Sequence, residues 1–158
     1  MQMKQKYTQY LPSDSLRNFI KYFWAFEYNE NDVEFVVLPD ACFDLVIDFE
    51  HRKLQNIYLT GVWTKPHKVT VTKGTILFAI RFKILAAEYL LYKELKSILD
   101  TMTLLPKNFW NIHKVDCFNF ENFCSTLSVH IISILKRLKN IDHRKLKLFD
   151  YIYNKRVY

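Results

Sequence analysis

The hydrophobic pattern of this chain changes its period once, near Phe82, and that change limits the possible folds most strongly. Before Phe82, apolar and polar residues alternate, which places every second side chain on the same face of a strand. After it, apolar residues recur at spacings of three and four, as on one face of an amphipathic helix. The 158 residues are enough for one domain with its own core. The pattern therefore predicts an α+β fold in which strands come first and helices follow.

Short strands separated by polar turns account for the region before Phe82. The clearest pair runs from His67 to Lys83, where Lys73-Gly74 supplies a tight turn, so we predict a β-hairpin there. Strands of this length and spacing predict a small antiparallel barrel or sandwich. The other expected strands are 19–28, 33–38, 43–49 and 57–62.

Alternation also assigns side chains to the two faces of each expected strand. Asp44 and Asp48 lie opposite the apolar face of one strand, and Arg81 lies opposite that of another. If Asp44 and Arg81 both point inward, the buried pair is costly and marks a ligand-facing element; if both point outward, it is an ordinary surface pair of little energetic consequence. The apolar faces carry Phe43, Leu45, Ile47 and Phe49, then Ile76, Phe78, Ile80 and Phe82, and a third strand places Tyr22, Trp24, Phe26 and Tyr28 together.

Helical periodicity dominates the rest of the chain. Good helix formers predict a first helix from Ala86 to about Leu99 or Thr101. Asn119 is a suitable N-cap for a second helix of about 18 residues with one apolar face. That apolar face is the predicted contact of a homodimer, through Phe123, Leu127, Ile131 and Ile134.

Positive charge is concentrated at the C-terminal end of the chain. The whole sequence has 23 Lys and Arg against 16 Asp and Glu, a formal net charge of +7. Residues 135–158 carry 8 of the basic residues and 2 of the acidic ones, so residues 1–134 are nearly neutral. A protein that binds nucleic acid with its main surface spreads positive charge over that surface, which is not the case here. The basic end either approaches an anionic partner or forms a solvated helix.

Composition and motifs exclude several classes of protein. The sequence has 2 glycines, too few for a GxGxxG fingerprint or a P-loop, so a nucleotide-binding enzyme is not expected. No apolar run approaches the ~18 residues that a membrane span needs, and the first ten residues lack the apolar core of a secretory signal. The 3 cysteines show no CxxC spacing, which indicates a cytoplasmic protein without disulfides.

Catalytic and metal-binding patterns are also missing from the sequence. The 5 histidines never occur as HxH or HExxH, so we predict no metal site and no cofactor. Cys42 with His67 is one combination of nucleophile and base, but unpaired cysteines are more often small buried residues. Asp40 follows a proline and is explained by a turn. Asp44 and Asp48 are about 13 Å apart along one strand, too far for a retaining pair of carboxylates. We expect no catalytic residues and no enzymatic activity.

The chain is rich in aromatic residues, with 13 Phe, 10 Tyr and 3 Trp. These side chains either fill the core, which is the more common case, or line an apolar pocket for a small organic molecule. Stacking on single-stranded nucleic acid would need basic residues between the aromatics, and the strands carry acids there at least as often. The predicted ligand-binding residues are Trp24, Phe26, Asp44, Trp63, Phe78 and Arg81.

Several segments resemble, in the same order, the N-terminal domain of AraC-family transcription regulators. PDACFDLVI at 39–47 is similar to the family's P-D-G-C-x-D-L segment, and IKYFW at 20–24 is similar to its I-x-x-Y-W. IRFK at 80–83 resembles the start of its R-F-x-P-G, and RKLKLFDYI at 144–152 resembles the helix that leads into its DNA-binding domain. The resemblance covers about residues 11–154.

This resemblance implies a fold and a function. It implies a cupin-like barrel over 1–83 that senses an unknown small-molecule effector, and a dimerising helical region over 84–140 packed on the barrel in the same domain. A basic helix or linker over 141–158 would lead to a DNA-binding domain that this chain lacks, and DNA would be read only through that domain. Ala41 replaces the family's glycine, and Ile84-Leu85 replaces its Pro-Gly. The alternatives are a stand-alone small-molecule-binding barrel and an enzyme of the metal-barrel type.

Overall fold

Eight strands form two antiparallel sheets in the part of the chain that the structure, a computed structural model, describes: residues 6–27, 30–116 and 119–154. The larger sheet contains, in spatial order, β1 (Lys6–Tyr10), β2 (Ile20–Glu27), β7 (Ile76–Lys83), β4 (Cys42–Glu50), β5 (Lys53–Thr60) and β8 (Met102–Leu105). The smaller sheet pairs β3 (Val33–Val37) with β6 (His67–Val71). The helices are α1 (Leu85–Tyr89), α2 (Phe120–Arg137) and α3 (His143–Asn154), and 3-10 turns lie at Asp14–Leu16, Leu95–Ile98 and Phe109–Lys114.

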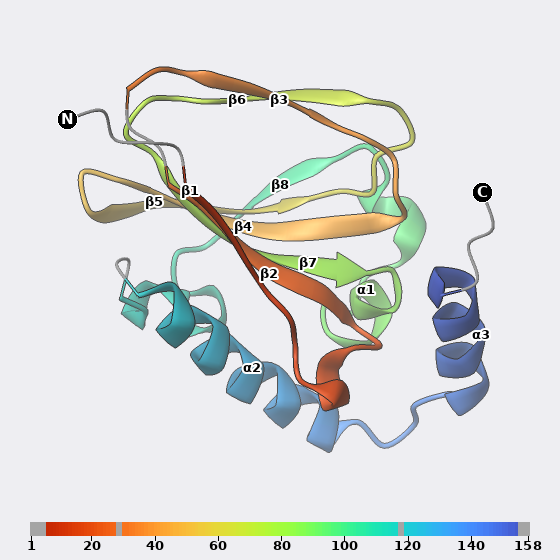
Figure 1. Cartoon of the computed structure of the whole chain (residues 1–158). Coiled ribbons are helices and arrows are strands. Elements are labelled where there is room, and N and C mark those ends of the chain that lie inside the picture. The colour runs from red at the N-terminus through yellow and green to blue at the C-terminus, as the bar shows by residue number, and fades with distance from the viewer. Residues whose placement is uncertain (1–5, 28–29, 117–118, 155–158) are drawn as a thin grey trace.

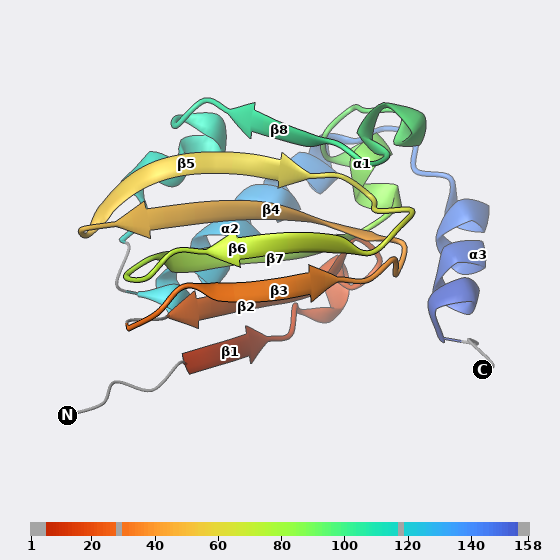
Figure 2. The same ribbon diagram turned by 90° about the horizontal axis from the view of Figure 1, so that it is seen from above.

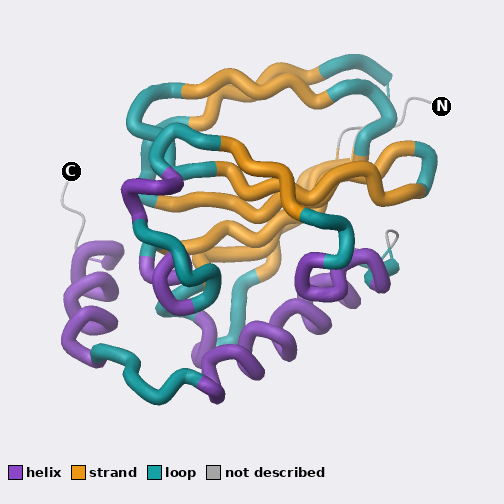
Figure 3. Tube along the Cα trace, turned by 180° about the vertical axis from the view of Figure 1, so that it is seen from behind, coloured by secondary structure: helices purple, strands orange, loops and turns teal. Residues whose placement is uncertain are grey.

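The two sheets and α2 form three layers (Figure 1). The smaller sheet lies over one face of the larger sheet, and α2 crosses the opposite face, as the view from behind also shows (Figure 3). Seen from above, β3 and β6 cover the middle of the larger sheet (Figure 2). The fold is therefore α+β, with antiparallel strands and a C-terminal helical segment, as the sequence predicts. The larger sheet is open, with β1 and β8 as its edge strands.

Side chains of the larger sheet alternate between its two faces, and the predicted faces of β4 and β7 are confirmed. One set faces α2 and forms the main core, and the other set faces the smaller sheet and forms a second, smaller core. Of the aromatic face expected on β2, Tyr28 lies outside the described residues. The main core includes Phe43, Leu45, Ile47, Phe49, Phe78, Ile80 and Phe82, whereas Val46, Leu77 and Ala79 belong to the smaller core.

The predicted hairpin of β6 with β7 is wrong, although both strands form. β6 pairs with β3, and β7 lies between β2 and β4 in the other sheet. Gly74 provides the expected turn, with a φ of +78°, but the turn carries the chain from one sheet to the other. Beside β3, β6 brings Val71 against Leu77 and the other residues of the smaller core. Alternation determines which face of a strand is buried but not which strand lies alongside it.

The long helix predicted after Ala86 is also wrong. α1 ends at Tyr89, because Tyr92 adopts a left-handed conformation with φ 54° and the Lys93 amide donates to the Ala87 carbonyl at 2.8 Å, which closes the helix. The chain then forms β8, which pairs with β5 at the edge of the larger sheet. The helical region expected over 84–140 therefore also contains a strand, which lies just after the predicted helix.

Gly61 allows the end of β5 to meet the segment that precedes β8. Its amide donates to the Thr101 carbonyl at 2.6 Å, and the Val62 amide donates to the Ile98 carbonyl at 2.9 Å. A Cβ on Gly61 would lie 2.0 Å from the Ile98 carbonyl oxygen. Glycine is therefore needed for this close approach of two backbones.

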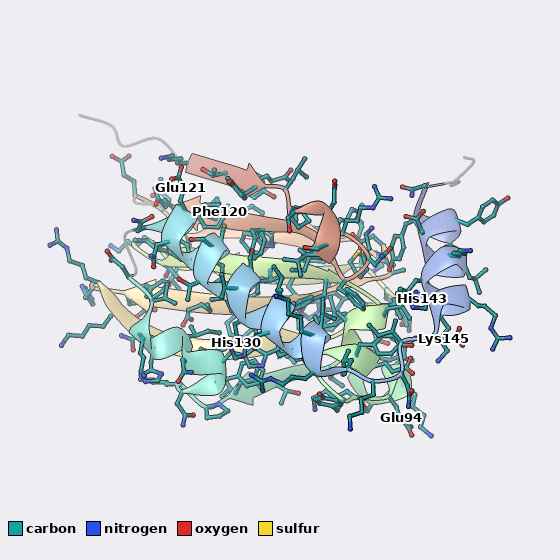
Figure 4. The ribbon with its side chains drawn as sticks, turned by 90° about the horizontal axis from the view of Figure 1, so that it is seen from below. Glu94, Phe120, Glu121, His130, His143 and Lys145 are labelled. Carbon is teal, nitrogen blue, oxygen red and sulfur yellow. The ribbon has the colours of Figure 1, made fainter. Side chains whose placement is uncertain are left out.

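The prediction for α2 is confirmed in position, length and cap. The helix covers 18 residues, and the Asn119 side chain accepts a hydrogen bond from the Asn122 amide at 2.9 Å. It runs diagonally across the larger sheet, with Phe120 and Glu121 at its start and His130 further along (Figure 4). Among the described residues, no helix combines the length and the apolar character needed to cross a membrane.

The predicted dimer contact on α2 is wrong, because its residues belong to the core of the chain itself. Phe123, Leu127 and Ile131 are 0% exposed, and Ile134 is half-buried against the same core. An amphipathic helix buries its apolar face against whichever apolar surface is available, and here that surface is the chain's own sheet. Phe123, Leu127 and Ile131 are therefore not available to a partner chain, and the homodimer itself stays a prediction.

α3 is the basic helix predicted near the C-terminal end. It lies beside the end of the larger sheet at which β4 begins and β7 ends (Figure 1). Leu146 and Phe149 pack against the main core, and the Lys145 ammonium forms an ion pair with Glu88 at 3.1 Å. None of its described residues is fully buried. Residues 155–158 of the predicted basic segment lie outside the described residues.

Candidate ligand-binding cavity

A cavity of about 270 Å³ lies between the two sheets, on the face of the larger sheet that points away from α2. Strands of both sheets contribute to its walls. The volume is slightly below the ~300 Å³ at which the usual range of small-molecule pockets begins. The aromatic lining consists of Tyr7, Tyr22, Trp24, Phe26, Phe35, Tyr58 and Trp63, and the polar lining of Asp44, Thr60 and Arg81.

The structure brings together five of the six residues predicted to bind a ligand. Those that line the cavity are Trp24, Phe26, Asp44, Trp63 and Arg81. Phe78 does not, because it lies on the opposite face of β7, where it is 0% exposed and packs against the rings of Phe49 and Phe123. The assignment of Phe78 to this site was therefore wrong. That the other five bind a ligand stays a prediction.

Arg81 and two aspartates form a buried group at one wall of the cavity, which we call the Arg81 cluster. Arg81 Nη1 donates to Asp44 Oδ2 at 2.7 Å, and Arg81 Nη2 donates to Asp40 Oδ2. Trp24 Nε1 donates to Asp44 Oδ1 at 3.3 Å. The side chains of Arg81 and Asp44 are each 11% exposed. Of the two arrangements that the sequence left open, the buried one is present.

The loop before β4 holds Asp40 in contact with Arg81. Asp40 Oδ1 accepts a hydrogen bond from the Cys42 amide at 3.1 Å, which forms an Asx-turn. Ala41 lies inside this turn with φ 59°, in the left-handed region that favours glycine. Ala41 therefore forms this turn at some cost in backbone strain.

Burial and charge pairing act in opposite directions in the Arg81 cluster. Burial by itself lowers the pKa of Arg81, but Asp44 and Asp40 outweigh it and raise that pKa above its ordinary value, so Arg81 stays protonated. Burial raises the pKa of Asp44, and the charge of Arg81 with the hydrogen bond from Trp24 offsets only part of this rise. The cluster therefore has two carboxyl groups and one guanidinium in a site largely closed to water.

The pKa values of two tyrosines in the cavity wall, Tyr22 and Tyr58, are raised by burial. Burial raises the pKa of Tyr22 to about 12, against an opposite effect of Arg81. Burial also raises the pKa of Tyr58 to about 12, with smaller contributions in the same direction from Asp48 and Asp44. Both phenols are neutral at physiological pH and present hydroxyl groups that donate and accept hydrogen bonds.

One side chain of α3 is bound to the loop that holds Asp40. The Tyr153 hydroxyl donates to the Ala41 carbonyl at 2.7 Å and accepts from the Ile84 amide at 3.0 Å. Ala41 directly follows Asp40, the partner of Arg81. A short series of contacts therefore connects the cavity wall with α3.

The other candidate groups in the sequence do not form a chemical site. Cys42 is 3% exposed, and burial raises the pKa of its thiol, whereas His67 stacks on Trp63 with ring centroids 3.8 Å apart. Burial raises the pKa of Cys124 to about 12, and Cys117 lies outside the described residues. Within residues 6–27, 30–116 and 119–154, no three His, Cys, Asp or Glu side chains are grouped so that they could hold a metal ion.

Larger hollows lie elsewhere on the molecule. One, of about 350 Å³, borders α2, another, of about 560 Å³, lies between α1 and α3, and a third, of about 300 Å³, lies beside Tyr153 of α3. Their lysine, arginine and glutamate side chains are exposed or half-buried. Among the hollows formed by the described residues, only the cavity between the sheets has a buried charged group, that of Asp44, among aromatic rings. We therefore regard the inter-sheet cavity as the better candidate site.

Part of this site was missed in the sequence. Asp40 was assigned to a turn, and its second carboxylate oxygen also binds Arg81. Tyr22 was placed on the correct face by its alternation with Trp24 and Phe26, which was a usable signal. Tyr58 carried a similar signal, because it alternates with buried apolar residues of β5.

The same part of the chain is covered by a known protein family. Residues 8–103 match the family model described as a domain of unknown function, DUF6597. This chain belongs to the DUF6597 family. From residue 8 onward, the DUF6597 match contains both sheets except the second half of β8. It includes every cavity-lining residue except Tyr7, whereas α2 and α3 lie outside it. No curated protein and no solved structure matches the chain.

Proposed function

We propose that this DUF6597 chain is the effector-sensing domain of an AraC-type transcription regulator that acts in the cytoplasm as a homodimer, and that it does not read DNA itself. Two of the segments that resemble AraC-family regulators, 39–47 and 80–83, supply the Arg81 cluster from β4, its preceding loop and β7. In this proposal the two sheets correspond to the cupin-like barrel of that family. The cavity beside the Arg81 cluster is the effector site.

The series of contacts from the cavity to α3 carries this proposal. It runs from Arg81 in the cavity wall to Asp40, and from the adjacent Ala41 carbonyl to the Tyr153 hydroxyl. A ligand that changes how Arg81 is held shifts the loop before β4, and with it the contact that retains α3. Because no described residue of α3 is fully buried, few contacts oppose such a change. A DNA-binding domain attached to α3 would receive the signal in this way.

A thermal-shift screen of small organic molecules tests whether the cavity binds an effector. We expect hits that raise the Tm of the parent chain by several degrees at saturation but have no effect on Val69→Trp, because this indole fills the cavity from the smaller sheet. Thr70→Trp is the matched control, since Thr70 is the next residue and is exposed on the outer face. Hits that stabilise Val69→Trp as much as Thr70→Trp, or a screen without hits, would contradict binding in this cavity.

A stand-alone small-molecule-binding protein is the alternative, and the same cavity favours it. The two functions differ in one result, because a stand-alone binding protein has no need to transmit ligand binding to α3. Hydrogen exchange of the α3 amides, measured with and without a ligand, separates them.

A further inference from the structure

Among the described residues, the lining of the inter-sheet cavity has one acid, Asp44, and one base, Arg81, and two further acids, Asp40 and Asp48, lie close to it. Arg81 is the one cation among the lining residues that the structure describes, and both of its Nη atoms bind carboxylates. Asp48 lies on the same face of β4 as Asp44, where its carboxylate accepts a hydrogen bond from the Asn56 amide at 2.6 Å. A positive charge placed in the cavity would therefore be attracted, and more strongly than in water because the site is largely buried.

The rings around the cavity favour the same sign of charge. Tyr22, Trp24, Tyr58 and Trp63 all line it, and the faces of tryptophan and tyrosine rings attract cations. At Tyr58 the charges of Asp48 and Asp44 add to the effect of burial in raising the pKa, whereas at Tyr22 the charge of Arg81 acts in the opposite direction. The part of the cavity beside Tyr58 therefore favours an ammonium group.

An anionic ligand would find the charge of Arg81 already balanced by two carboxylates. A carboxylate binds arginine best through two parallel hydrogen bonds from the guanidinium. In Arg81 each Nη atom already donates to one carboxylate, and the N–H groups that remain, including that of the buried Nε, are open to a neutral acceptor. An anion beside Arg81 would also be repelled by Asp44 and Asp40.

We propose that the cavity binds a small organic cation, namely an ammonium group attached to an aromatic or branched apolar group. The ammonium lies beside Asp44, where it supplies the second positive charge of the Arg81 cluster, and the apolar part contacts the rings of the cavity. This inference rests on the proposed function, because it names the chemical class of the effector of that site.

Calorimetric titration of the full chain with three probes of one carbon skeleton tests this inference. The probes are 3-phenylpropylamine, 3-phenylpropanol and 3-phenylpropionate, which are respectively cationic, neutral and anionic at pH 7. We expect the amine to bind about tenfold more tightly than the alcohol, and the carboxylate to bind most weakly. Val69→Trp should abolish binding of the amine, and Thr70→Trp should retain it.

Removal of one carboxylate provides a second measurement. Asp40→Asn neutralises the more exposed acid of the Arg81 cluster, whose side chain is 27% exposed. This variant should bind the amine several-fold more weakly than the parent and bind the alcohol with unchanged affinity. Asp48→Asn is the control and should have a smaller effect, because Asp48 binds Asn56 and is not part of the Arg81 cluster. If the alcohol or the carboxylate binds most tightly and Val69→Trp abolishes that binding, the ligand is not a cation, but the proposed sensing function still holds. If none of the three probes binds, the proposal of a cationic ligand is contradicted. The proposed function is contradicted as well only if the thermal-shift screen gives no hits in the cavity.

Discussion

Replacement of Phe123 by alanine is expected to lower the free energy of unfolding by about 3–5 kcal/mol. Phe123 is 0% exposed, and its ring centroid lies 5.4 Å from that of Phe78 and 6.4 Å from that of Phe23, where α2 meets the larger sheet. This loss is a large part of the ~5–15 kcal/mol that stabilises a typical domain. Urea denaturation followed by circular dichroism measures it. Val129→Ala, on the side of α2 where Val129 is 68% exposed, should change the free energy by less than about 0.5 kcal/mol.

A second substitution on the same face separates a core role from a dimer role. Leu127→Glu places a carboxylate at a position that is 0% exposed, so we expect this variant not to fold. A dimer contact would give a different result, because the variant would stay folded and become monomeric. Light scattering after size exclusion, together with circular dichroism, distinguishes the two. A folded Leu127→Glu monomer would contradict the packing of α2 on the sheet.

Replacement of Arg81 by methionine is expected to cost about 3–5 kcal/mol, because it leaves Asp44 buried without its charged partner. Methionine keeps much of the length of the side chain, so the loss reports mainly on charge. Lys68→Met is the control for an exposed pair, since Lys68 is 76% exposed and lies 3.7 Å from Glu34. That variant should lose at most about 1 kcal/mol. Similar losses in both variants would contradict the central place of the Arg81 cluster.

The loss in Arg81→Met should also depend on pH. Burial raises the pKa of Asp44 in the parent, and Arg81 is the main group that opposes this rise, so the pKa rises further without it. A carboxyl group with a higher pKa in the folded state holds its proton more tightly there, so stability falls as the pH rises above the ordinary value of 3.8. The difference between variant and parent should therefore be larger at pH 7 than at pH 4. An equal difference at both pH values would mean that Arg81 acts through packing.

Features that depend on neighbours in sequence were predictable. The two faces of β4 and of β7 follow from the alternation of apolar and polar residues. The same alternation places Asp44 and Arg81 on the face that lines the cavity. The extent of α2 followed from its apolar spacing and from Asn119, whose side chain caps the helix. In each case the local pattern and the tertiary fold favour the same conformation.

Features that depend on distant segments were not predictable. β6 was expected beside β7, but it pairs with β3 in the smaller sheet. There its side chains cover the face of the larger sheet that points away from α2. The end of α1 is set by the left-handed conformation of Tyr92, a residue with no turn signal of its own. β8 forms by pairing with β5, a strand distant from it in the chain.

Two errors in the predicted sites have separate physical causes. Phe78 was grouped with the cavity residues because it is aromatic, whereas its register with Ile80 and Phe82 places it in the main core. The apolar face of α2 was assigned to a dimer because such a face has the same spacing whether it packs on its own chain or on another. The sequence pattern identifies a buried face but not its partner.

Hydrogen exchange of the α3 amides tests most directly whether the cavity communicates with α3. It is measured with and without saturating amounts of the tightest of the three phenylpropyl probes, in the parent, in Tyr153→Phe and in Tyr151→Phe. Tyr153 joins α3 to Ala41, whereas Tyr151 is 62% exposed and serves as the matched control. We predict that the probe changes exchange in residues 39–42 and in α3, and that only Tyr153→Phe loses the change in α3 while still binding the probe. A probe that alters exchange solely in the strands around the cavity, with α3 of the parent unchanged, would contradict the proposed function.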